Sequence, residues 1–144
     1  MIRVTRRYRF SASHRLHCAQ LSETENRELY GKCNNPFGHG HNYQVDISVR
    51  GPVNQRSGRA VSIDALDGLV QEEVLRAFDH KNLNTQVPAF IVVAPTTENL
   101  GIELFRRLKQ NWQHTFPGRW PKLEKIRIAE TDRNIFEVSA DEKI

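Results

Sequence analysis

Cysteine is scarce in this sequence, and long apolar runs are missing. Cys18 and Cys33 are the two cysteines among 144 residues, and the N-terminal residues lack the apolar stretch of a signal peptide. We therefore expect a cytoplasmic protein whose thiols are free or functional rather than paired in a disulfide. No apolar run approaches the ~18 residues of a membrane span, so the sequence predicts no membrane segment.

Aromatic residues are also few, at 8% of the chain, and they are scarce beside the basic cluster Arg3–Arg9. This scarcity argues against a surface that stacks the bases of RNA. The formal net charge of +4 and the pI of about 9.3 are mildly basic. Such a charge fits a phosphate-bearing small substrate, a nucleic acid or a merely solvated surface. We expect a small-molecule substrate and no nucleic-acid partner.

What the sequence does contain is a clear succession of apolar periods. Apolar residues alternate with polar ones in two long segments, and each alternation predicts a strand with one buried face. The apolar residues of the first are Ile2, Val4, Tyr8, Phe10 and Ala12, and those of the second are Tyr43, Val45, Ile47 and Val49. Arg6 is the one exception on the apolar side of the first strand.

The period then becomes helical. Residues 63–78 and 100–112 carry apolar side chains at helical spacing, which predicts two helices. Ser62 or Asp64 is the expected N-cap of the first. Thr96 or Thr97 is that of the second.

Two further strands are predicted around Ile126–Ile128 and Phe136–Val138. The order ββααββ predicts one α+β domain over residues 1–144, in which two helices cover one face of an antiparallel four-stranded sheet. Residues 15–40 show no clear period, so we expect a long functional loop with a short helical turn near Glu25–Tyr30.

Three histidines converge at one corner of this predicted sheet. His14 continues the apolar face of the first strand. His39 and His41 lie before the second strand and continue its apolar face toward the N-terminus. Gly40 leaves the backbone between these two histidines free to bend. If the strands pair as an antiparallel hairpin, the three imidazoles meet. Three imidazoles suit zinc and leave a fourth tetrahedral position open, which is typical of a catalytic site. The alternative is a set of satisfied core histidines, and His17 is a reserve ligand.

Three other features belong to the same corner. Cys33 lies in the loop between the strands, where a nearby zinc ion or imidazole favours the thiolate as a base or nucleophile. Asp79 can orient the adjacent His80, although a histidine favoured by a helix C-terminus is the other interpretation. Glu130 continues the apolar face of the third strand, where a carboxylate needs either an ion pair or two N–H donors from a ligand edge.

Five short motifs between residues 10 and 131 carry a resemblance to a known family. They are Phe10–His14, Gly31–Pro36 with His39–Tyr43, Asp79–Leu83, Pro95–Asn99 and Glu130–Thr131. Together they resemble the 6-pyruvoyl-tetrahydropterin synthase family. The resemblance implies the tunnelling fold, or T-fold, in which trimers close a barrel of strands. It also implies that two trimers stack as a homohexamer, with active sites between subunits.

The resemblance further implies a substrate and a reaction. The substrate is 7,8-dihydroneopterin triphosphate, and a carbon–oxygen lyase of tetrahydrobiopterin biosynthesis eliminates triphosphate from it to form 6-pyruvoyl-tetrahydropterin. Hydrogen moves within the molecule, so no external redox cofactor is needed. The implied roles are zinc ligands for His14, His39 and His41, general base for Cys33, proton relay for Asp79 and His80, pterin anchor for Glu130, and ring contact for Thr96 and Thr97.

The same superfamily includes 6-carboxy-tetrahydropterin synthase of queuosine biosynthesis, which uses the same substrate and zinc. In that enzyme the cysteine typically stands closer to the His-Gly-His motif. Here five residues separate Cys33 from His39, and Asn34-Asn35-Pro36 resembles the pyruvoyl-forming type. Two hypotheses from other classes remain, namely a zinc hydrolase that uses metal-bound water and a basic RNA- or protein-binding module with structural zinc.

Overall fold

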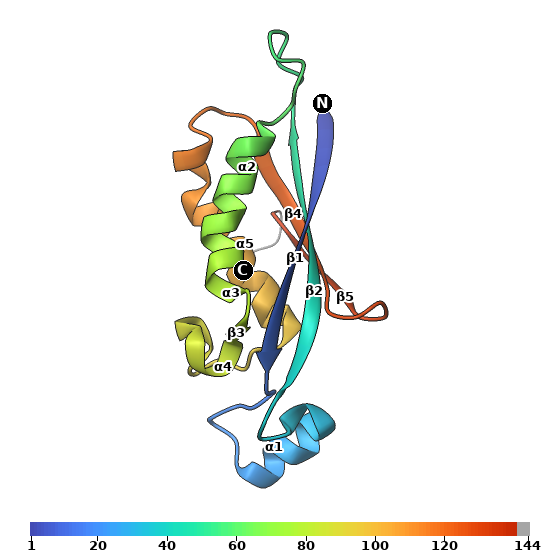
Figure 1. The fold of residues 1–144 in the computed structure, drawn as a ribbon, viewed down its shortest axis with the longest axis vertical. Coiled ribbons are helices and arrows are strands. Elements are labelled where there is room, and N and C mark those ends of the chain that lie inside the picture. Colours follow the sequence, from blue (N-terminus) through green and yellow to red (C-terminus); the bar gives the residue numbers. More distant parts are fainter. Residues whose placement is uncertain (141–144) are drawn as a thin grey trace.

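A five-stranded sheet organises the chain in the computed structural model, which describes residues 1–140 (Figure 1). The strand order is β3-β1-β2-β4-β5. The strands span Ile2–His14 (β1), His39–Gly51 (β2), Lys81–Asn82 (β3), Lys122–Ala129 (β4) and Ile135–Ser139 (β5). The pairs β1–β2, β2–β4 and β4–β5 are antiparallel, as predicted, and the long β1–β2 hairpin forms the centre of the sheet.

The prediction of a four-stranded, wholly antiparallel sheet was wrong at one edge. β3 pairs in parallel with β1 through Ala12 and Ser13. Because β3 has only two residues, it is too short to show the period-2 alternation from which a strand can be predicted.

The helical segments that follow β2 in the chain lie on one side of this sheet (Figure 1). The helical segments are α1 (Glu23–Tyr30), η1 (Gly31–Asn34), α2 (Ile63–Val70), η2 (Gln71–Leu75), α3 (Arg76–Phe78), α4 (Leu83–Gln86), η3 (Pro88–Phe90) and α5 (Thr97–Thr115). α2, η2 and α3 follow one another without a break and form the first predicted helix. Ser62 and Thr96 are the N-caps, since the hydroxyl of each accepts a hydrogen bond from the backbone N–H three residues on.

The core lies between the inner face of the sheet and the two long helical segments. Tyr43, Val45, Ile47 and Val49 of β2 are fully buried, as their alternation predicts. The stripe of α5, which consists of Leu100, Leu104, Phe105, Leu108 and Trp112, is buried in the same core. Within residues 1–140, no helix has both the length and the apolarity needed to cross a membrane.

Arg6, the exception on the apolar side of β1, reaches across to helix α2. Its guanidinium donates two hydrogen bonds to the Asp67 carboxylate, at 3.0 and 2.9 Å. Tyr8 donates a third to the same carboxylate, at 2.6 Å. The charge on the inner face of the strand is therefore paired at the rim of the core rather than buried alone.

Residues 15–38 project from the end of the sheet as the predicted loop, with α1 at its tip (Figure 1). The predicted helical turn near Glu25–Tyr30 is present as α1, which begins two residues earlier. Ser22 and Glu25 form a capping box at its start. The loop is thereby an ordered extension at the end where the histidines lie.

Candidate metal centre

The pairing of β1 with β2 brings three histidines together. His39 is the direct partner of His14 in the antiparallel register, and His41 is the partner of Ala12. One ligand nitrogen from each imidazole lies within 4.8 Å of the other two. The Nε2 atoms of His14 and His39 are 3.1 Å apart. The three imidazoles expected to meet therefore do so.

Gly38 positions the first of these ligands on β2. It has a φ of +72°, which side chains rarely adopt, and a Cβ there would lie 3.0 Å from the His14 carbonyl oxygen. The chain can thus turn tightly into β2 beside His14. Gly40, expected to provide the bend, lies instead within the regular strand, opposite Ser13.

The surroundings of His14 leave one of its nitrogens available to a metal. Its Nδ1 atom lies 2.8 Å from the Pro95 carbonyl oxygen. Since a carbonyl only accepts, Nδ1 carries the proton and Nε2 presents its lone pair. His14 is 1% exposed, and burial lowers its pKa below the ordinary value. Burial also lowers the pKa of His41, so both rings favour the neutral form that binds metals.

His41 provides a direct test of whether a metal fits. Its Nε2 atom is buried and makes no hydrogen bond to any described residue. A buried polar atom without a partner costs free energy, and such atoms are uncommon in folded proteins. A cation at the meeting point of the three imidazoles would give this nitrogen a partner. The donor set therefore fits a bound metal ion, and three imidazole nitrogens are typical zinc ligands.

Glu130 lies at the edge of this centre, directly after β4. One carboxylate oxygen is 3.4 Å from His41 Nε2 and 3.6 Å from His14 Nε2. Its side chain is 16% exposed, so the carboxylate is partly shielded and faces the histidines. This arrangement agrees with the prediction that Glu130 has a partner on the inner face of the sheet.

Thr96 and Thr97 lie beside the centre because the neighbouring Pro95 contacts His14. The Thr96 hydroxyl is engaged as the N-cap of α5. The Thr97 hydroxyl is buried and has no hydrogen-bond partner among the described residues. Thr97 is thus the member of the pair whose hydroxyl does not cap the helix.

Cys33 is half-buried in η1 and is not one of the three grouped ligands. Its carbonyl oxygen accepts a hydrogen bond from the Leu16 N–H at 2.8 Å, which ties the loop back to the end of β1. His17, the reserve ligand, is also outside the group and instead lies 3.4 Å from the Asn34 side chain. Cys18 is a free thiol as well.

Asp79 and His80 lie at the β1 edge of the sheet. The Ser11 N–H donates to the Asp79 carboxylate at 2.9 Å, and the His80 N–H donates to the Ser11 carbonyl oxygen at 2.6 Å. His80 Nε2 is 3.5 Å from Asp79, and its side chain is 82% exposed. His80 lines a cavity of about 500 Å³ that Ser11 and His41 also border. Neither Asp79 nor His80 belongs to the group of three histidines that could hold a metal ion.

Comparisons with known proteins agree with this geometry. The family model described as 6-pyruvoyl tetrahydropterin synthase matches residues 3–141. The chain belongs to this family. A 6-pyruvoyl tetrahydrobiopterin synthase from Poecilia reticulata is 45% identical over 92% of this chain and 86% of its own. The human protein of that name is 42% identical over 92% and 87% of the two chains.

A solved structure of the family has the same fold. The 6-pyruvoyl tetrahydropterin synthase of Caenorhabditis elegans matches with a TM-score of 0.89 and 38% identity, over 97% of this chain and 96% of that chain. An archaeal relative, from Archaeoglobus fulgidus, is named for 6-carboxy-5,6,7,8-tetrahydropterin synthesis. It is only 29% identical, over 65% of this chain and 69% of its own. The family is thus clear, and the carboxy-forming relative is distant.

Sequence reasoning missed two groups that contact His14. One is the Pro95 carbonyl oxygen, and the other is the Tyr43 hydroxyl, 3.5 Å from His14 Nδ1. A carbonyl oxygen is present at every residue, so it leaves no signal in the sequence. Tyr43 was placed on the correct face of β2, and its position one pleat beyond His41 was the available signal.

Proposed function

We propose that this protein converts 7,8-dihydroneopterin triphosphate to 6-pyruvoyl-tetrahydropterin, with release of triphosphate. The observation that carries the proposal is the three-histidine centre, with a nitrogen of His14 freed by Pro95 and with Glu130 alongside. Membership of the family supplies the substrate and the reaction.

We propose zinc as the metal held by His14, His39 and His41. Bound there, zinc would supply Lewis-acid polarisation of the substrate's side-chain oxygens. The chain's own contribution is orientation: Pro95 fixes the proton on His14 Nδ1, and Gly38 brings His39 to its partner on β1. Ligand nitrogens fixed in this way need little reorganisation when the metal binds.

Glu130 is proposed to anchor the pterin. A carboxylate can accept two parallel N–H bonds from a planar ring edge, and the partial burial of Glu130 strengthens such bonds. The unpartnered Thr97 hydroxyl provides a further hydrogen bond at the ring. These contacts would fix the ring so that the substrate's side chain lies over the histidines.

Cys33 is proposed to remove a proton from the substrate's side chain as the general base. Asp79 and His80 would relay that proton. Because this pair is outside the histidine group and the His80 side chain is 82% exposed, we propose that it serves the site of an adjacent subunit. Each active site would then combine Cys33 from one chain with Asp79 and His80 from its neighbour.

Assembly into trimers and a stacked hexamer is part of the proposal. Within residues 1–140, one edge of β1 is unpaired beyond the short β3, and so is the outer edge of β5. Open edges of this length need a covering strand, and joining them between copies would close a barrel.

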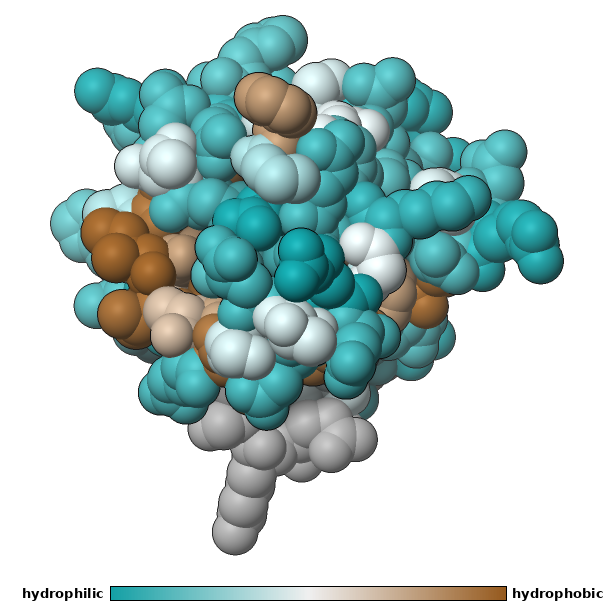
Figure 2. Space-filling view, turned by 90° about the horizontal axis from the view of Figure 1, so that it is seen from below, coloured by the Kyte–Doolittle hydropathy of each residue, from teal (hydrophilic) through white to brown (hydrophobic). Residues whose placement is uncertain are grey.

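At the loop end, the surface is mostly hydrophilic with an apolar patch (Figure 2). Phe37, Ile91 and Val92 are exposed there around one cavity, which suits contact with another copy.

One assay tests the reaction. Purified protein is incubated with 7,8-dihydroneopterin triphosphate, the product is identified by mass with and without a reductant trap, and bound metal is quantified. We expect the pyruvoyl product and zinc at one ion per chain. A product that has lost two carbons would instead identify 6-carboxy-tetrahydropterin synthase.

The thiol is tested by Cys33→Ala, with Cys18→Ala as the matched control because both cysteines are half-buried and free. We expect Cys33→Ala to retain zinc and fold while kcat falls by roughly a hundredfold or more. Cys18→Ala should remain active. Full turnover by Cys33→Ala would favour a hydrolase that uses metal-bound water, and salt-sensitive nucleic-acid binding without turnover would favour a binding module.

A further inference from the structure

A cavity of about 330 Å³ lies in the loop that carries Cys33. It is lined by one face of α1, by the residues that follow this helix and by the residue directly after β1. Three of the lining side chains are cationic, namely Arg15, Arg27 and Lys32, and one is acidic, namely Glu23. The lining of this cavity therefore carries an excess of positive charge.

These cations have no acidic partner in the protein. Among residues 1–140, none of the three forms an ion pair with a carboxylate. Glu23 and Arg27 are one helical turn apart on α1, a spacing that permits an ion pair, but the two side chains do not form one. Like charges that line one cavity repel one another, and a bound anion would remove this repulsion.

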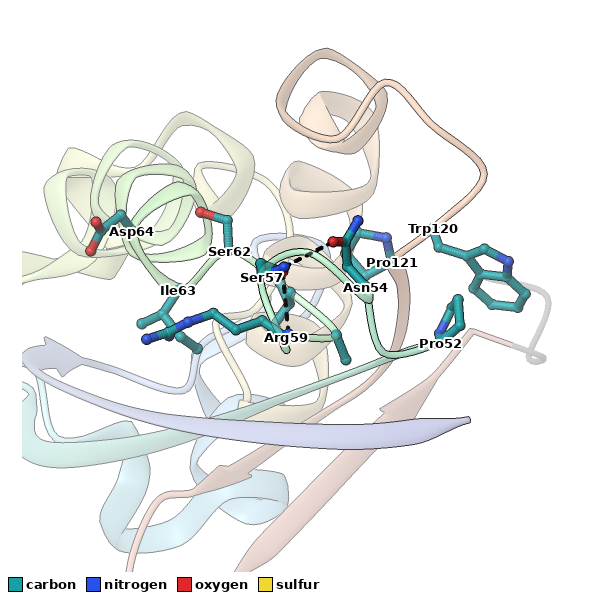
Figure 3. Close-up of a pocket in the computed structure, with 11 residues that line it drawn as sticks. Pro52, Asn54, Ser57, Arg59, Ser62, Ile63, Asp64, Trp120 and Pro121 are labelled. Carbon is teal, nitrogen blue, oxygen red and sulfur yellow. Dashed lines mark hydrogen bonds between the residues drawn. The ribbon is translucent and has the colours of Figure 1, made fainter.

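The cavity in Figure 3 shows that such an excess is not a general property of this basic chain. This second cavity lies at the end of β2 far from the histidines, between Pro52, the start of α2 and Trp120–Pro121, and has a volume of about 700 Å³. Its charged lining residues are Arg59 and Asp64, whose charges are opposite. It is the larger of the two cavities, but its charge does not select an anion.

Arg15 is held in place through both its backbone and its side chain. Its backbone N–H donates to the Asn84 side chain at 2.7 Å, and its backbone carbonyl oxygen accepts from the Asn84 amide at 2.8 Å. Its Nε atom donates to the backbone carbonyl oxygen of Asn34 at 3.0 Å. A guanidinium has five N–H donors in a fixed fork, so most of them remain for another acceptor. An arginine oriented in this way loses little freedom when it binds a phosphate.

The cationic lining adjoins the groups that are proposed to carry out the reaction. Arg15 directly follows the metal ligand His14, while Lys32 and Asn34 flank Cys33 in the chain. Consecutive Cα atoms are about 3.8 Å apart. The lining therefore begins one residue from a metal ligand and one residue from the proposed general base. In the proposed substrate, the triphosphate is attached to the last carbon of the side chain that lies over the histidines.

We propose that this cavity binds the triphosphate group of the substrate through Arg15, Arg27 and Lys32. The assignment rests on the proposed function, because that function supplies a substrate with a triphosphate. Phosphate oxygens accept hydrogen bonds from several Arg and Lys donors at once. With its ring held by Glu130 and its triphosphate by the three cations, the substrate is fixed at both ends, and its side chain is positioned between them.

Calorimetric titration of the zinc-loaded full chain with inorganic triphosphate tests the site without the reaction. We expect one triphosphate per chain and at least about a tenfold loss of affinity in Arg27→Ala/Lys32→Ala, because hydrogen bonds to charged groups are among the stronger ones. The matched control is Arg56→Ala/Arg59→Ala, which removes the same charge from the loop beside the cavity of Figure 3 and should bind triphosphate normally. Absence of binding, or equal affinity in Arg27→Ala/Lys32→Ala, would overturn the proposal.

A second ligand shows whether the effect is confined to the triphosphate. The affinity for 7,8-dihydroneopterin, which lacks the triphosphate, should be the same in Arg27→Ala/Lys32→Ala as in the unchanged protein. An equal loss of affinity for both ligands would mean that the substitutions disturb the whole site, and would overturn the assignment. Circular dichroism and zinc content confirm that each variant is folded and loaded.

Kinetics with 7,8-dihydroneopterin triphosphate separate this proposal from the proposed function. Arg27→Ala/Lys32→Ala should raise KM roughly tenfold with little change in kcat, since a contact made equally before and during the reaction affects KM alone. Turnover with an unchanged KM would overturn the triphosphate site and leave the proposed function standing. Absence of turnover in the unchanged protein would overturn the proposed function and the identity of the ligand, but not triphosphate binding measured by titration.

Discussion

Asn34 ties the segment that carries Cys33 to the end of β1. Its side-chain amide donates to the Leu16 backbone carbonyl oxygen at 2.7 Å, and the backbone carbonyl oxygen of Asn34 accepts from Arg15 Nε at 3.0 Å. Asn34 is only 4% exposed, so these bonds are shielded from water. Arg15 follows His14 directly in the chain. The position of Cys33 relative to the metal ligands is therefore fixed through its neighbour.

The first prediction concerns Asn34→Ala. Loss of the amide leaves the partly buried Leu16 carbonyl without its donor, so the free energy of unfolding should fall by about 1 kcal/mol. If Asn34 positions Cys33, kcat should fall by roughly tenfold with little change in KM, because the thiol rather than the bound ring is displaced. Steady-state kinetics and chemical denaturation measure the two effects.

Asn35→Ala is the matched control, because Asn35 is exposed and its side chain accepts only the nearby Phe37 N–H. The rate of Cys33 alkylation, measured with Cys18→Ala as background, reports the thiol directly. We expect Asn34→Ala to change this rate and Asn35→Ala to leave it unchanged. Equal kinetics and equal alkylation in both variants would show that Asn34 does not position Cys33.

At the residue scale, the alternation of inward-facing and outward-facing side chains along each strand was the information that placed the site residues. His14, His39, His41 and Glu130 were predicted on one face because each continues an apolar alternation, and the structure confirms that face. The Pro95 carbonyl could not be predicted, since its position depends on how the α5 segment packs. The face taken by His80 could not be predicted either, because it follows a helix end with a φ of 58° rather than a regular period.

At the scale of elements, α2 is fastened to β1 by one polar cluster. Asp67 of α2 accepts two bonds from Arg6 and one from Tyr8, and these bonds lower the pKa of its carboxyl, Arg6 contributing most. The Arg6 and Asp67 side chains are 45% and 37% exposed, so solvent screens their charges. The cluster therefore contributes through its geometry more than through unscreened Coulomb energy.

The second prediction is that Asp67→Asn lowers the free energy of unfolding by about 1 kcal/mol at neutral pH. The carboxyl has a lower pKa when folded than when unfolded, so its stabilisation is present above the unfolded-state value of about 3.9. It is lost as the pH falls through the lowered folded-state pKa. Denaturation measured from neutral to acidic pH should show that the difference in the free energy of unfolding between the two proteins shrinks as the pH falls through this folded-state pKa.

Glu72→Gln is the control for this measurement. Glu72 pairs with Arg76 within the same helical segment, where both side chains are largely exposed. We expect a change in stability smaller than that of Asp67→Asn. A difference between Asp67→Asn and the unchanged protein that stays constant through acid pH would mean that the Asp67 charge does not stabilise the fold.

The long strands and helices were predictable because their periods extend over many residues, whereas the short elements were not. In the first helix, Leu66, Val70, Val74 and Phe78 follow one another at steps of four, and each step drifts by about 40° in a regular α-helix. The structure has a wider turn at η2, a π-helix, which keeps these residues on the buried face. The drift is predictable from the spacing of these residues, whereas the π-helical turn that corrects it is not.

At the scale of the whole molecule, the chain does not gather all of its proposed catalytic groups at one point. The three histidines form one group, while His80 lies at the β1 edge with an exposed side chain. The alternation of side chains predicts which face of a strand each residue takes, but not which chain lies next to that face. The sequence pattern therefore does not distinguish a site within one chain from a site shared between copies. The edges of β1 and β5 that are open among residues 1–140 make sharing geometrically accessible.

The third prediction separates these two arrangements. Cys33→Ala and His80→Ala should each have little activity alone. If each site combines Cys33 of one subunit with His80 of the next, co-assembly of the two variants regenerates intact sites, on the order of a quarter of the total for random mixing in a closed ring. The measurement compares the specific activity of the co-expressed variants with that of separately made proteins combined without exchange of subunits.

As control, Cys33→Ala is co-expressed with the double variant Cys33→Ala/His80→Ala. No subunit of this mixture has the thiol, so no activity should return. Co-assembled variants that stay inactive while forming mixed oligomers would place both groups in a single chain's site, and the outward exposure of His80 would then require a rearrangement on substrate binding.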